Sequence, residues 1–131
     1  MTVFESRINI NRPVHEIYSF LANLNNHQQL MPENIMDWVS TTDTASFNVQ
    51  NMAKLSLKVG SRVTDKEIKI IPAVKPPFDL ELKWELFSVN NNADVVFSIS
   101  ADLNMMLKMV ASGPLQKLTD HQTQSLGSIL S

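Results

Sequence analysis

The chain has 131 residues, no cysteine, a formal net charge of −2 and no cluster of lysine and arginine. The length predicts a single domain spanning residues 1–131, large enough to bury a core without covalent cross-links. The lack of cysteine excludes disulfides, thiolate metal sites and a cysteine nucleophile, and the charge argues against a nucleic-acid partner. Because the sequence has no signal-peptide pattern and no apolar run long enough to span a bilayer, we expect a cytoplasmic protein.

The chain opens with a predicted strand and a predicted helix. Phe4, Ile8 and Ile10 alternate with polar residues, which is typical of a half-buried strand. Between residues 14 and 24 the apolar residues recur three and four positions apart, which predicts a helix that buries one face. Pro13 fits the first turn of that helix, where a missing N–H costs nothing.

From residue 36 the apolar period changes to two, which predicts a series of strands. We place Gly60-Ser61 and Asn90–Asn92 in turns between strands, and Asn51 in a tight turn or bulge. Connections of hairpin length predict an antiparallel sheet with one covered face. The predicted strands cover residues 36–41, 46–50, 54–59, 62–71, 80–86 and 94–101.

The predicted strand over residues 62–71 has an inconsistent apolar phase. Val63 and Ile71 belong to one face of it, whereas Ile68 and Ile70 belong to the other. A β-bulge near Asp65-Lys66 would bury both sets, and we predict a bulge or a strong local twist between residues 64 and 68.

The last segment, residues 103–130, predicts a long helix. Pro114 lacks an N–H and crowds the preceding turn, so a kink or break is expected beside it. The order of strand, helix, six strands and long helix predicts an α+β fold with the helices on one side of the sheet. The apolar stripe expected to anchor this helix comprises Leu107, Val110, Ala111, Leu115 and Leu118.

Three stretches carry a family resemblance. The opening strand leads into Asn11–Leu21, Leu30-Met31-Pro32 precedes the hairpins, and Leu103–Leu107 is followed by Gly113-Pro114-Leu115. Together they resemble the START-like helix-grip superfamily, also called SRPBCC, which includes the birch-pollen-allergen fold and the polyketide cyclase/dehydrase group. The glycine-rich loop of the pollen-allergen branch is absent, and no catalytic residues of an enzyme branch map onto this chain.

The resemblance implies a curved seven-stranded antiparallel sheet wrapped around the long C-terminal helix, with a hydrophobic cavity between them. The implied partner is a hydrophobic small molecule or lipid, and no cofactor is implied. We interpret Met106 and Met109 as adaptable ligand contacts, because methionine is flexible and polarizable, and we predict that Trp84 faces inward. The predicted cavity wall comprises Trp38, Phe47, Leu57, Trp84, Phe97, Met106, Met109 and Val110.

Residue types that carry chemistry are few. His15, His27 and His121 lack ligand spacing, so no metal site is predicted and all three are interpreted as solvated. Residues 65–67, Asp-Lys-Glu, form a charged rim or, if the bulge turns one inward, an acid/base group in the cavity. No nucleophile elbow, phosphate loop or dinucleotide fingerprint is present.

Three functions remain open at this point. The favoured one is a non-enzymatic binder of a hydrophobic molecule. The second is a polyketide cyclase/dehydrase-like enzyme, which requires an inward-facing ionisable or hydroxyl group. The third is a protein-interaction module with a filled core. In that case the methionines would cover an edge of the core or form an exposed patch that meets a second copy in a homodimer.

Overall fold

The computed structural model describes residues 1–50 and 53–131, so the turn or bulge predicted at Asn51 lies outside the described residues. The helices are α1 (Val14–Leu21), the 3-10 helix η1 (Leu24–Leu30) and α2 (Met105–Ile129). The strands are β1 (Thr2–Ile10), β2 (Ile35–Ser40), β3 (Thr44–Val49), β4 (Ala53–Val63), β5 (Glu67–Pro72), β6 (Leu80–Val89) and β7 (Asn92–Ala101).

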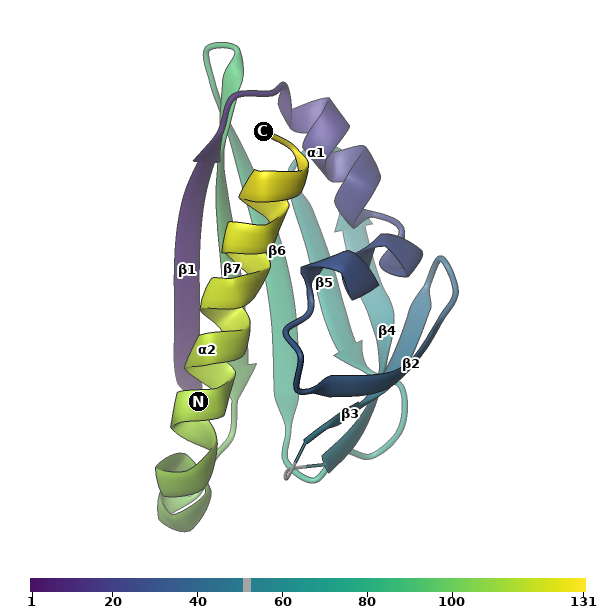
Figure 1. Cartoon of the computed structure of the whole chain (residues 1–131), viewed down its shortest axis with the longest axis vertical. Helices are drawn as coiled ribbons and strands as arrows, with labels where there is room; N and C mark the ends of the chain where they lie inside the picture. The colour runs from purple at the N-terminus through teal and green to yellow at the C-terminus, as the bar shows by residue number, and fades with distance from the viewer. Residues whose placement is uncertain (51–52) are drawn as a thin grey trace.

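Within the described residues these strands form one antiparallel sheet in the order β1-β7-β6-β5-β4-β3-β2. Strands β2 to β7 pair in chain order as hairpins, and β1 joins the far edge by pairing with β7 from Thr2 opposite Ala101 to Ile10 opposite Ala93. Figure 1 shows α2 lying along β1 and β7, with α1 and η1 over the same face of the curled sheet. The predicted α+β helix-grip architecture is confirmed.

The hairpin of β6 and β7 follows the predicted two-residue period. Along β6, Leu82, Trp84 and Leu86 are buried while the intervening residues are half-exposed. On the outer face Lys69 of β5 approaches Glu81 of β6, with 3.6 Å between nitrogen and oxygen. Pairs this exposed contribute little to stability, so burial on the inner face dominates the energetics of the sheet.

The boundaries of β4 and β5 correct two predictions. Gly60 does not turn the chain, because β4 continues through it and shifts register between Val59 and Ser61. The phase change near residue 65 is a hairpin turn and not a bulge within a strand: Val63 pairs with Glu67, and Asp65 between them has a φ of 60°. Val63 is exposed, so it does not have to be buried on the same face of the sheet as Ile68 and Ile70, and no bulge is required.

Helix α2 begins with Asn104, whose side-chain oxygen accepts a hydrogen bond of 2.9 Å from the backbone N–H of Leu107. The helix runs unbroken across Pro114, so of the kink or break predicted beside it the break is wrong. Proline removes the N–H that would bind the carbonyl of Val110. Both Val110 and Pro114 are exposed, so water can satisfy that carbonyl and the helix tolerates the proline.

Candidate functional site

An apolar pocket of about 30 Å³ lies between α2, η1 and the inner face of β2 to β7. Of the described residues that line it, His27 and Gln122 carry the polar groups, and the others are aliphatic or aromatic. The lining comprises Leu24, His27, Met31, Trp38, Ala45, Phe47, Leu55, Leu57, Ile70, Leu80, Leu82, Ile99, Leu115, Leu118 and Gln122.

A bulge in β2 positions Trp38 on the pocket wall. The pairing of β2 with β3 shifts register between Met36 and Val39, so Asp37 and Trp38 together oppose Phe47. Asp37 takes a φ of 57°, and its carboxylate accepts a hydrogen bond from the Asn48 amide. Without this extra residue, alternation would turn Trp38 away from the core.

The ring of Trp38 stacks on Phe47, with 5.2 Å between the ring centroids and 12° between the planes. Its indole N–H donates to the hydroxyl of Ser40 at 2.9 Å, so the polar atom of the ring is satisfied at the rim. Trp38 therefore presents an apolar ring face to the pocket while its N–H stays hydrogen-bonded.

Trp84 and Phe97 lie in the core next to the pocket. Trp84 is completely buried, as predicted, and stacks on Phe97 with 4.3 Å between centroids. Along the same two strands, the neighbouring inward pair of Leu82 and Ile99 lines the pocket. Trp84 and Phe97 thus back the site without lining it.

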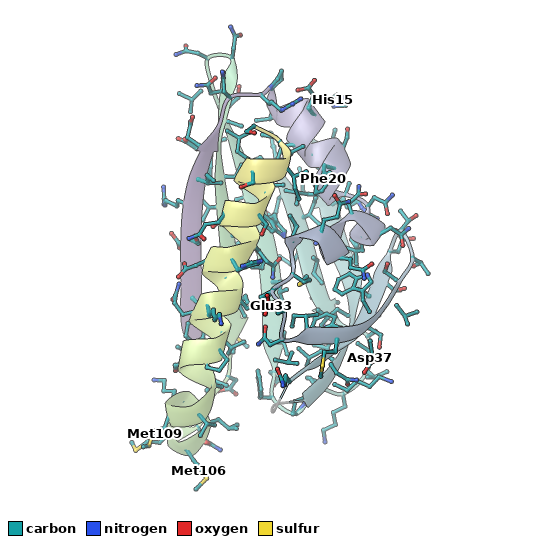
Figure 2. All side chains as sticks on the ribbon, viewed as in Figure 1. His15, Phe20, Glu33, Asp37, Met106 and Met109 are labelled. Carbon is teal, nitrogen blue, oxygen red and sulfur yellow. The ribbon has the colours of Figure 1, made fainter. Side chains whose placement is uncertain are left out.

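The two methionines and the valine predicted on the cavity wall lie elsewhere, and that placement is wrong. Met106, Met109 and Val110 are 76%, 83% and 63% exposed. Figure 2 shows Met106 and Met109 pointing into solvent from the first turns of α2, which project past the end of the sheet. Leu115 and Leu118, farther along the helix, are buried and line the pocket.

His27 corrects the interpretation of the histidines as solvated. Its side chain is 3% exposed, and Nε2 lies 2.8 Å from the carbonyl oxygen of Leu21. Burial lowers the pKa of His27 to about 4, against the smaller, opposite effect of this hydrogen bond. The ring is therefore neutral at neutral pH. Because a carbonyl can only accept, Nε2 carries the proton and Nδ1 is a bare acceptor.

The sequence contained a signal for the burial of His27. Leu24, His27 and Leu30 are three residues apart, and a 3-10 helix has three residues per turn. All three therefore share one face of η1, and all three are buried.

A polar turn of α2 is buried where the helix crosses the sheet. Thr119 donates to the carbonyl of Leu115 at 2.7 Å. The hydroxyl of Thr123 donates to the carbonyl of Asp120 at 3.0 Å and is hydrogen-bonded to the Ser6 hydroxyl of β1 at 2.6 Å. Between them Gln122 is 1% exposed, and its amide nitrogen has no hydrogen-bond partner among the described residues.

The charged residues at the β4–β5 turn do not line the pocket. Asp65 lies in the turn, where its carboxylate is 3.1 Å from Nδ1 of His15 on α1. His15, labelled in Figure 2, is on the outside of the molecule. The three charged residues at 65–67 line a separate, open hollow with Val14 and Phe87, so a bulge does not turn an acid/base group into the apolar pocket.

Over residues 1–50 and 53–131, no three histidine, aspartate or glutamate side chains gather closely enough to hold a metal ion. The helices there include none that is long and apolar enough to cross a membrane.

Comparison with known proteins identifies the fold. No family model matches the sequence, and no curated protein matches it significantly. Among solved structures, a START superfamily protein from Mycobacterium smegmatis is similar, at 12% identity and a TM-score of 0.69, over 98% of this chain and 96% of that one. The chain has the START-like helix-grip fold.

Two other structures support this assignment. The protein XoxI from Bacillus cereus is 9% identical with a TM-score of 0.77, over 99% of this chain and 96% of that one. The Aha1 dimer from Colwellia psychrerythraea is 21% identical with a TM-score of 0.68, over 99% and 96%. The predicted resemblance is therefore confirmed at the level of the fold.

Proposed function

We propose that the protein binds a small apolar molecule in the pocket between α2, η1 and the sheet. The observation that supports this function is the composition of the pocket lining, which is aliphatic and aromatic apart from His27 and Gln122. Ligand sites have this character: mostly apolar walls with a few polar groups that fix orientation. Trp38, Phe47 and Leu57 would contact the ligand directly, with Trp84 and Phe97 supporting the wall from behind.

Binding requires the pocket to enlarge. Its volume of about 30 Å³ accommodates about one or two water molecules, whereas small-molecule sites commonly span roughly 300–1,000 Å³. The half-buried Met31 is an unbranched side chain on the lining and can change rotamer at low cost. The described conformation is therefore a closed one, and a ligand must stabilise a more open one.

The low pKa of the ionisable side chain in the lining favours binding over catalysis. His27 is the ionisable residue among the described residues of the lining. Because burial lowers its pKa to about 4, it is a weak base at neutral pH and cannot act as an acid there. A cyclase-like reaction would need a stronger proton donor or acceptor at the ligand.

Titration with the neutral fluorescent probe N-phenyl-1-naphthylamine tests this function. Ala45→Val adds two methyl groups to the pocket wall and should lower probe affinity by about threefold or more, while stability changes little because the cavity provides room. Met109→Leu changes an exposed side chain of similar volume outside the pocket and should leave the affinity unchanged. Equal affinities for wild type and Ala45→Val, or no binding by wild type, would contradict the function.

A second function is favoured by the small volume of the pocket. A protein-interaction module needs a filled core and an exposed apolar surface, and Met105, Met106 and Met109 form such a surface at the start of α2. A second copy of the chain is the partner we propose for it, supported by the dimeric state named for the Colwellia protein. Absence of probe binding together with a mass that doubles with concentration in sedimentation would favour this function over the first.

A further inference from the structure

Gln122 differs from its buried polar neighbours on α2. Thr119 and Thr123 satisfy their hydroxyls within the helix, and Thr123 also reaches Ser6 of β1. Gln122 is equally buried, yet its amide nitrogen has no partner among the described residues. A buried donor without a partner is costly. The indole N–H of Trp84 also lacks a partner among the described residues, but only Gln122 of the two lines the pocket, where a bound molecule can supply the missing acceptor.

His27, on η1, supplies the complementary group in the same pocket lining. Its Nε2–H is used by the carbonyl of Leu21, which fixes the tautomer and leaves Nδ1 able only to accept. Both His27 and Gln122 line the same pocket, one from η1 and one from α2, and these two elements pack against each other. The residues that line the pocket therefore include one donor without a partner, at Gln122, and one ring, that of His27, whose second nitrogen can only accept.

We propose that the ligand is an apolar molecule bearing a single hydroxyl group, which accepts a hydrogen bond from the Gln122 amide and donates one to Nδ1 of His27. This inference rests on the proposed binding function and adds the chemical class of the ligand. A hydroxyl is both donor and acceptor, so it matches the pair, whereas a methyl group matches neither. A carboxylate is disfavoured, since the described lining contains no lysine or arginine to compensate its charge.

Phenol and toluene provide a matched pair of probes, because they differ by a hydroxyl in place of a methyl group. Their affinities are measured by NMR titration of the ¹⁵N-labelled protein. In Gln122→Met, which keeps the length of the side chain but removes the amide, the ratio of phenol affinity to toluene affinity should fall by about three- to tenfold. Gln124→Met makes the same change at an exposed position two residues away and should leave the ratio unchanged.

The side-chain amide signals of Gln122 in the wild type provide a readout that does not depend on a variant. They should shift on saturation with phenol and stay in place with toluene. If toluene binds and the ratio is the same in wild type and Gln122→Met, or if phenol leaves these signals in place, the hydroxyl-specific site is refuted while apolar binding stands. If neither compound binds, the proposed function fails as well.

Discussion

The burial of the two parts of α2 is the reverse of what their composition suggests: the apolar part is exposed and the polar part is buried. Five of the six residues at positions 105–110 are apolar, yet Met105, Met106, Met109 and Val110 are exposed. Positions 111–126 are much more polar, yet they supply the buried residues of the helix, including Thr119 and Gln122. Figure 1 explains the difference, because only the second part lies over the sheet.

Formation of the core explains neither the exposed apolar residues of the first part nor the buried amide of the second part. Exposed apolar patches and buried polar groups are the informative exceptions to normal burial. The first part of α2 contains the exposed patch and the second part the buried amide. Residues 105–110 are therefore the candidate partner surface, and Gln122 is the candidate ligand contact.

The largest expected effect is on the free energy of unfolding, when one side chain in each part of α2 is truncated to alanine. Leu118→Ala should lower the free energy of unfolding by about 2–5 kcal/mol, because Leu118 is buried against the sheet and its loss enlarges the cavity. Met106→Ala should change it by less than about 0.5 kcal/mol, as for exposed sites generally. Urea unfolding measures both. A large cost for Met106→Ala would mean that the first turns are covered in solution.

The next largest effect is the pH dependence of stability that His27, on η1 beside α2, should produce. Folding lowers the pKa of His27 from 6.5 to about 4, so the unfolded chain binds the proton more readily than the folded protein. The contribution of neutral His27 is therefore complete above pH 6.5 and is lost as the pH falls toward 4. Its size is on the order of 3 kcal/mol.

Urea unfolding between pH 7 and pH 4 checks this contribution. In His27→Gln, which can still donate to the Leu21 carbonyl, the loss of stability over this range should be smaller than in wild type. His15→Gln changes an exposed histidine on α1 and should retain the wild-type dependence. Identical pH profiles for wild type and His27→Gln would show that His27 is not buried as a neutral ring.

The parts of the fold governed by local periodicity could be predicted from the sequence. The alternation along β6 predicted the inward position of Trp84, because hairpin partners are close in sequence and one face of the sheet is buried. The turn at Asp65 was missed because residues 64–66 contain no glycine or proline. Gly60, which suggested a turn, instead lies at the register shift within β4.

The candidate site was predictable only in part. Phe47 and Leu57 line the pocket by simple alternation, but Trp38 reaches it through a bulge that the sequence indicated only by an aspartate tolerant of positive φ. Met106 and Met109 follow helical spacing, and spacing cannot say where the sheet beneath a helix ends. The roles of the residues on the pocket wall in ligand binding are predictions to be tested with bound probes.

The smallest expected effect tests how closely the covered part of α2 packs on β1. A Cβ added at Gly127 would overlap Cδ1 of Ile8. Alanine favours helix over glycine by about 1 kcal/mol, but displacing a packed side chain costs roughly 1–3 kcal/mol. Gly127→Ala should therefore lower the free energy of unfolding slightly, by about 1 kcal/mol. Ile8→Val deletes the overlapping atom, so in that background Gly127→Ala should stabilise the protein instead.

A double-mutant cycle in urea measures this coupling between Ile8 and Gly127, which should be about 1–2 kcal/mol and favourable in the double variant. Ser128→Ala is the matched control, because it adds no atom at an exposed neighbouring position and should show no coupling to Ile8→Val. Additive effects of Ile8→Val and Gly127→Ala would mean that the end of α2 stands farther from β1 than described. The close contact that buries Thr123 beside Ser6 of β1, one turn earlier, would then also be in doubt, and with it the difference between the two parts of the helix.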